Sequence, residues 1–127
     1  MKPYVMCGAL VLVLACTITP SNPMLVVAYH VTKTPEGSGL RCDSLLYQNT
    51  QGQFIKVTNP ALPWSIAVNV PAGSSIQATA WIVATGGGQS ATLRVTWTIP
   101  GVSTAADSSF GTSTAAGAFT LGVSRRL

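Results

Sequence analysis

The chain has 127 residues and a net charge of +4 at pH 7, and only 8% of its side chains are charged. Its basic residues are scattered apart from the neighbouring Arg125 and Arg126, whereas a nucleic-acid-binding protein would gather them on one face. The length is sufficient for one domain with a core of its own. We therefore expect one small domain, with no nucleic acid among its partners.

The first recognisable element is an apolar run over residues 4–15, interrupted only by Gly8. As a helix it would extend about 18 Å at ~1.5 Å per residue, which is short of the roughly 30 Å hydrocarbon core of a bilayer. Lys2 precedes the run and a polar segment, residues 17–23, follows it. This order is typical of a signal peptide, so we predict that residues 1–15 direct export.

The apolar run ends at Cys16, and residues 13–16, Val-Leu-Ala-Cys, resemble the lipobox of bacterial lipoproteins. The resemblance implies that residues 1–15 are removed, that Cys16 becomes the lipidated N-terminus, and that residues 16–24 include a spacer. Several acyl chains together would hold the protein firmly to a membrane. Thr17, in place of an aspartate, resembles the pattern of lipoproteins sorted to the outer membrane in bacteria that have one. We thus expect an exported protein, lipid-anchored in the bacterial cell envelope.

Three alternatives concern the same cysteine and stay open at this point. The opening segment is an ordinary signal peptide with an incidental Cys16, or it is an uncleaved anchor. A disulfide between Cys16 and Cys42 is the third alternative. If Cys7 leaves with the signal and Cys16 is acylated, Cys42 is the one remaining thiol, and the domain has no disulfide framework.

The rest of the chain reads as short strands separated by turns. Alternation of apolar and polar residues predicts about seven strands, over residues 25–34, 40–48, 53–58, 64–70, 75–84, 90–99 and 118–123. Residues 49–52 and 86–88 are predicted to be hairpin turns, and the small-residue stretch 103–117 is expected to be a connection. With no helical crossovers in the pattern, residues 25–127 should form an all-β, antiparallel β-sandwich.

Four blocks of this domain are similar to successive blocks of the MmpS-like exported proteins. They read VAYHVTKT, LLYQNTQGQ, NPALPWSIAVNVPAG and ATLRVTWTIPG, and Leu62-Pro63-Trp64 is the most specific part of the match. The resemblance implies an immunoglobulin-like β-sandwich held on the outer side of a membrane. In mycobacteria such proteins accompany large lipid and siderophore exporters. Here the anchor resembles a lipobox instead of a transmembrane helix, and a membrane transporter or another envelope protein is the expected partner.

Residues able to carry catalysis or bind a metal are scarce. The chain has one histidine, His30, and its acidic residues are Glu36, Asp43 and Asp107. A zinc site needs three or four ligands, and a lone histidine with Cys42 does not supply them. We therefore predict no enzyme activity, no metal and no cofactor.

The aromatic residues divide into core and surface candidates. Trp64 and Trp97 share their strand faces with aliphatic residues, which predicts core positions. Trp81 has the opposite phase to its apolar neighbours and is predicted to be exposed. With Tyr47 it would form a platform for a sugar or a protein partner. The sequence thus predicts a non-enzymatic accessory or binding lipoprotein, with a carbohydrate- or lipid-binding adhesive module as the alternative.

Overall fold

A computed structural model describes residues 23–99 and 103–127, so the predicted signal peptide and Cys16 lie outside the described residues. Eight strands make up the regular structure of these ranges. Their bounds are β1 Met24–Thr34, β2 Arg41–Gln48, β3 Phe54–Thr58, β4 Trp64–Pro71, β5 Ser75–Ala84, β6 Ser90–Ile99, β7 Ser103–Thr112 and β8 Gly117–Arg126.

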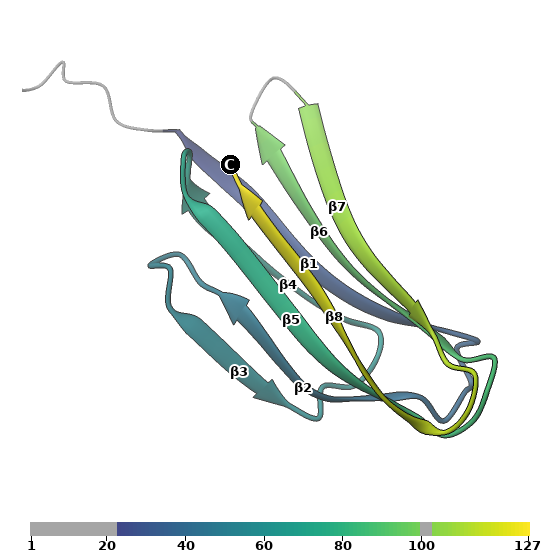
Figure 1. Ribbon diagram of the computed structural model, residues 1–127. Coiled ribbons are helices and arrows are strands. Elements are labelled where there is room, and N and C mark those ends of the chain that lie inside the picture. Colours follow the sequence, from purple (N-terminus) through teal and green to yellow (C-terminus); the bar gives the residue numbers. More distant parts are fainter. Residues whose placement is uncertain (1–22, 100–102) are drawn as a thin grey trace, which may run out of the picture.

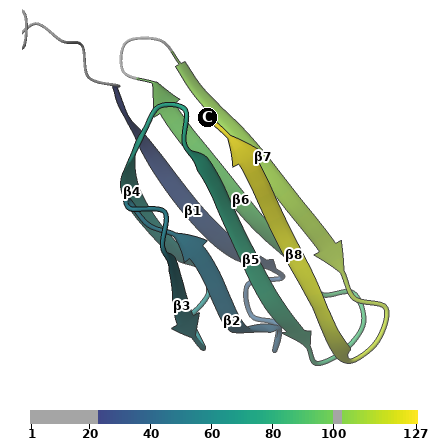
Figure 2. The ribbon, with the colours of Figure 1, turned by 60° about the vertical axis from the view of Figure 1, so that its left-hand side comes forward.

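The strands form two antiparallel four-stranded sheets that lie face to face (Figures 1 and 2). We call the sheet with strand order β4-β1-β6-β7 sheet A, and the sheet with order β3-β2-β5-β8 sheet B. The predicted all-β antiparallel sandwich is confirmed. It has eight strands instead of about seven, because β7, expected to be a connection, pairs with β6 along its whole length, from Ser90 opposite Thr112 to Ile99 opposite Ser103.

Most connections pass from one sheet to the other. Consecutive strands pair directly only in the hairpins β2–β3 and β6–β7 among the described elements. The hairpin turn predicted at 49–52 is confirmed, and Gly52 takes a positive φ of 77° there. The hairpin predicted at 86–88 is wrong, since these glycines join β5 in sheet B to β6 in sheet A.

The core lies between the sheets and follows the two-residue period of the strands. On β5 the inward positions are occupied by Ile76, Ala78, Ala80, Ile82 and Ala84, all of them buried. Sheet A contributes Val27, Tyr29, Val31, Leu93 and Val95 from its two central strands, each with no exposed surface. Burying one such large apolar side chain contributes roughly 1.5–3 kcal/mol, which makes this continuous layer the main source of stability.

A bulge in β2 decides which of its residues reach the core. The pairing with β5 shifts between Cys42 and Ser44, where Cys42 lies opposite Ile82 and Ser44 opposite Trp81. The extra residue, Asp43, lets Cys42 point inward together with Leu45 despite their odd spacing. The strand therefore has one continuous buried face on both sides of the bulge.

The two ends of the sandwich carry different turns and loops of the chain. At one end, the turn after β4 receives a hydrogen bond from Leu127 N to Ser74 O and donates one from Ala72 N to Pro23 O. The first strand thus starts, and the last strand finishes, at the same end, which we call the entry end (Figure 1). The opposite end, the far end, carries the loops 35–40 and 85–89.

Candidate functional site

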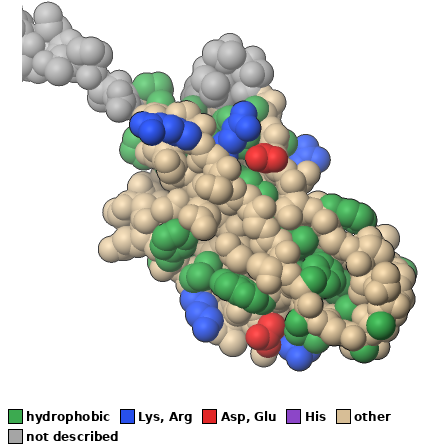
Figure 3. Space-filling model, viewed as in Figure 1, with side chains coloured by type: hydrophobic (Ala, Val, Ile, Leu, Met, Phe, Trp, Pro, Cys, Tyr) green, Lys and Arg blue, Asp and Glu red, His purple; other side chains and the backbone are tan. Residues whose placement is uncertain are grey.

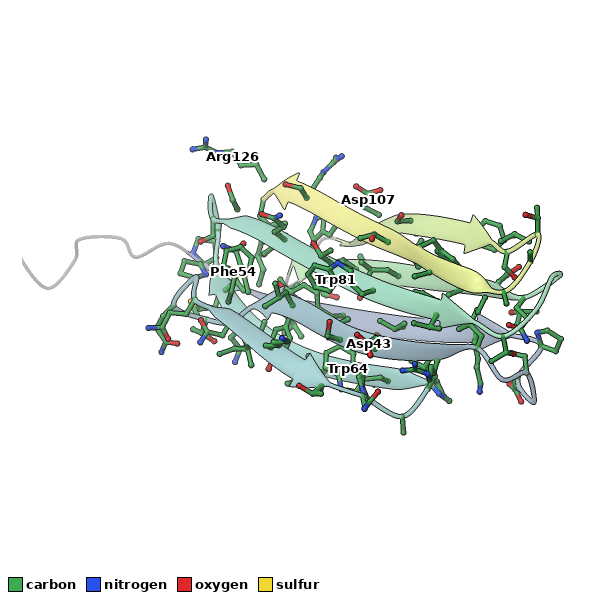
Figure 4. All side chains as sticks on the ribbon, turned by 60° about the horizontal axis from the view of Figure 1, so that its bottom comes forward. Asp43, Phe54, Trp64, Trp81, Asp107 and Arg126 are labelled. Atoms are coloured by element: carbon green, nitrogen blue, oxygen red, sulfur yellow. The ribbon has the colours of Figure 1, made fainter. Side chains whose placement is uncertain are left out.

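Trp81 is an exposed aromatic side chain near the middle of the outer face of sheet B. It lies on the central strand β5, with its inward neighbours Ala80 and Ile82 buried, and is itself 38% exposed. Across the sheet it pairs with Ser44 of β2 and Thr120 of β8. The exposure predicted for Trp81 is confirmed, and its two cross-strand partners carry small hydroxyl side chains; Figure 4 shows Trp81 on β5.

The side chains around Trp81 are mostly small or apolar, and few of them are charged. Leu46 and Val83, on the neighbouring outward positions, are half-buried, and Thr79 lies beside Gly122, which has no side chain to fill the space. Charged groups are few here: Lys56 lies on the edge strand, and Arg41 pairs with Asp43 at 3.3 Å near the far end. The result is a mainly uncharged surface with an aromatic ring near its centre.

The structure does not bring Tyr47 to this surface. Tyr47 is 7% exposed and belongs to the core, on the opposite side of the sheet from Trp81. Its ring lies between those of Tyr29, with centroids 5.4 Å apart, and Trp64, at 5.7 Å. The two-ring platform of Trp81 and Tyr47 predicted from the sequence is therefore not formed. The other exposed aromatic side chain on the described outer face is Phe54, 51% exposed at the start of β3 (Phe54–Thr58).

The aromatic row of Tyr29, Tyr47 and Trp64 fixes one region of the interior. The Tyr29 hydroxyl donates a hydrogen bond to the carbonyl of Gln48 at 2.9 Å, which satisfies its one buried polar group. Burial, and next the neighbouring Tyr47, raise the pKa of Tyr29 to about 12. Tyr29 therefore stays neutral across the physiological range and has a structural role.

One long side of the sandwich, where the edge strands β3 and β4 lie, is only partly closed. The inward side chains there are half-buried although they contact the core, and they are Ile55, Val57, Trp64, Ile66 and Val68. Trp97 is a core residue as predicted, whereas Trp64 packs at the rim of the core. The sequence contains the alternation of these residues but not the fact that their strands are edges, so this apolar side could not be read from it.

Two hollows lie at opposite ends of the sandwich. A shallow pocket of about 360 Å³ at the far end is lined by Thr32, Lys33, Glu36, Leu62 and Pro63. The ammonium of Lys33 there donates to the carbonyls of Ser38 and Leu40. The second, of about 390 Å³, lies at the entry end between the turns 49–52 and 71–75. The titratable side chains that line these two hollows are Lys33 and Glu36, both at the far-end pocket.

The residues considered for metal binding or nucleophilic chemistry lie apart. His30 is half-buried on the outer face of sheet A, between Ser65 and Arg94. Cys42 is buried, and its thiol donates to the carbonyl of Ser44 at 3.2 Å. Burial, and next the charge of Asp43, raise the pKa of Cys42 to about 11, so almost no reactive thiolate forms at neutral pH. Within the described residues no three potential metal ligands come together.

The burial of Cys42 also bears on the disulfide considered above. Its side chain is 1% exposed, so a bridge to Cys16, which lies outside the described residues, would have to reach into the core. No helix in the described ranges is long and apolar enough to span a bilayer. A scan against protein-family models finds no match for the chain, and a search among curated proteins finds no relative.

Proposed function

We propose that the chain is an envelope lipoprotein, acylated at Cys16, whose β-sandwich is a non-enzymatic accessory or binding module outside the membrane. The observation that supports this most is the division of the chain. All buried core residues of the described ranges lie between Leu25 and Val123, and the first strand begins directly after the proline-containing segment 17–23. In the sequence, the apolar run and Cys16 precede this strand, in the order that a signal and an anchor require.

The outer face of sheet B is the surface that we assign to a partner. A half-exposed tryptophan on a rigid central strand is a good contact residue, because aromatic side chains contribute much binding energy at little entropic cost. Trp81 has that position, and the face around it is the outer side of a four-stranded sheet. A membrane transporter or another envelope protein is the partner class that we propose, in line with the MmpS-like resemblance.

A carbohydrate is the second candidate ligand for the same face. Sugars stack on aromatic rings and form hydrogen bonds with hydroxyl side chains, and Trp81 pairs across the sheet with Ser44 and Thr120. The two candidates differ in what they require: a protein partner would contact a wide area around the ring, whereas a sugar would need only the ring and its nearest hydroxyls.

The anchor is tested by Cys16→Ser in the full chain. The wild-type N-terminal peptide should begin at Cys16 and carry a mass excess from acylation, measured by mass spectrometry of protein extracted from membranes. The variant should lack that mass and accumulate as precursor or as released domain. An unmodified peptide that begins at Met1 in the wild type would overturn the lipoprotein proposal.

The binding face is tested by Trp81→Ala, with Phe110→Ala as its matched control. Phe110 is 67% exposed and lies on sheet A, so it removes a comparable aromatic surface from the opposite side of the molecule. We expect only Trp81→Ala to reduce crosslinking to an envelope protein in intact cells. If it reduces binding to a glycan panel instead, the carbohydrate candidate is the correct one, and if it changes neither, the assignment of this face is wrong.

A further inference from the structure

The entry end of the sandwich combines exposed apolar side chains with exposed basic ones. Met24, at the start of β1, is 44% exposed, and Phe54, at the start of β3, is 51% exposed. Arg125 and Arg126, the last residues of β8, are exposed at the same end. Figure 4 shows Phe54 and Arg126 both at this end of the sheets, well away from Asp43.

The charges of the two ends differ. At the far end, the basic Lys33 and Arg41 are balanced by the acidic Glu36 and Asp43. At the entry end, the charged side chains of the strand ends that the structure describes are the two arginines. Figure 3 shows basic side chains where β8 finishes, with an acidic side chain close beside them. The nearest described acidic residue is Asp107, opposite Val95 further along the sheet, and its carboxylate accepts a hydrogen bond from Ser108 N.

We propose that the entry end is a membrane-contact surface, in which Met24 and Phe54 enter the lipid interface and Arg125 and Arg126 bind anionic headgroups. This inference rests on the proposed anchor, because the preceding chain joins the sandwich at Pro23 at this same end. Fully extended, residues 17–22 span at most roughly 20 Å. The entry end is therefore the part of the domain that an anchor at Cys16 holds closest to the bilayer.

The arrangement of the four side chains suits a flat lipid surface. Phe54 and Arg126 lie on the two edge strands of sheet B, so their backbones are about 15 Å apart at ~4.8 Å per strand. Met24 extends the contact to sheet A. The guanidinium of Arg125 lies 5.5 Å from the centre of the Trp97 ring, which holds this charge at the end of the sandwich. The contact points are thus spread across the end, as docking on a plane requires.

The experiment compares amide hydrogen exchange of the full chain in two kinds of vesicle, phosphatidylcholine alone and phosphatidylcholine mixed with phosphatidylglycerol. In the anionic vesicles, the entry-end turns 49–52 and 71–74 should exchange roughly tenfold more slowly than in the neutral ones, because each arginine near an anionic surface strengthens the contact several-fold. The far-end loops 35–39 and 86–89 should exchange at the same rate in both. High salt should remove the difference.

Matched variants identify the residues responsible. Arg125→Gln combined with Arg126→Gln, and separately Phe54→Ser, should abolish most of the slowing, whereas Arg94→Gln and Phe110→Ser, both exposed on sheet A, should not. Equal exchange of the entry-end turns in both vesicles, or unchanged slowing in the arginine variant, would overturn the proposal. Flotation with neutral vesicles reports on the anchor separately, so failure of the anchor and failure of this surface give different results.

Discussion

At the scale of single residues, the three tryptophans show how burial separates structural from binding roles. Trp97 is 8% exposed and packs in the core, Trp64 is half-buried beside the ring of Tyr47, and Trp81 is 38% exposed on an outer face. The stability of the fold should therefore depend on them in that order. A residue that contributes little to folding yet keeps a large exposed ring is the better candidate for a contact with another molecule.

Alanine substitutions of the three tryptophans test this order. We expect Trp97→Ala to lower the free energy of unfolding by about 3–5 kcal/mol, the usual range for a buried aromatic side chain. Trp64→Ala should lower it by about 2–3 kcal/mol, because part of its ring already faces water, and Trp81→Ala by less than about 1 kcal/mol. Chemical denaturation measures all three. A loss for Trp81→Ala as large as that for Trp97→Ala would show that Trp81 is part of the stabilising core.

The sequence predicts the positions of two of the tryptophans correctly and that of Tyr47 incorrectly. Alternation alone predicts the correct faces for Trp81 and Trp97, because β5 and β6 are regular strands in which it fixes the direction of each side chain. The prediction that Tyr47 lies on the surface beside Trp81 is wrong, because Tyr47 is buried. The bulge at Asp43 changes the phase of β2, and nothing in the local residue types marks its position.

At the scale of elements, β7 is the strand that the sequence did not predict. Its inward positions, opposite Trp97, Val95, Leu93 and Ala91, are occupied by Ala105, Asp107, Ser109 and Gly111. Such small and polar residues give no apolar alternation, which is the signal used to predict a strand. Pairing with β6 forms this strand, and a tertiary pairing of this kind cannot be seen in the residues of the segment alone.

Gly111 shows why β7 needs small residues at its inward positions. A Cβ added at Gly111 would lie 2.7 Å from the Phe119 ring of β8 and 3.2 Å from Leu121. The glycine thus lets β7 and β8, edge strands of different sheets, approach each other and close that side of the sandwich. The opposite side, where β3 and β4 lie, has no such close approach in the described strands, and its apolar side chains stay half-buried.

We therefore expect Gly111→Ala to destabilise the fold by about 1–3 kcal/mol, through the displacement of Phe119. Gly122→Ala is the matched control, because it is also a strand glycine, on β8, and its added Cβ would meet only Ala78 O at 3.9 Å. Thermal melts of the two variants should differ clearly, with Gly122→Ala close to the wild type. Equal melting temperatures would show that Phe119 moves aside at no cost.

At the scale of the whole molecule, the fold separates three surfaces of different character. The entry end carries Met24, Phe54 and the two arginines, the outer face of sheet B carries Trp81, and the side between β3 and β4 is apolar. A domain held at its entry end would direct that end toward the lipid and leave the broad face with Trp81 free for a partner. The proposed anchor, membrane contact and binding face are thus compatible in one orientation.

The last prediction is that the chain beginning at Thr17 folds by itself and binds no metal. All buried core residues of the described ranges lie between Leu25 and Val123, so this shorter chain keeps every core residue that the structure describes and should unfold cooperatively, near the melting temperature of the full protein. Since His30 lies on the outer face of sheet A and Cys42 points into the core, elemental analysis should find no stoichiometric zinc. A broad, non-cooperative melt would show that the segment before Thr17 contributes to the fold. Zinc at one equivalent, lost in His30→Ala or Cys42→Ala, would contradict the prediction that no metal binds and would require a metal site that the described residues alone do not form.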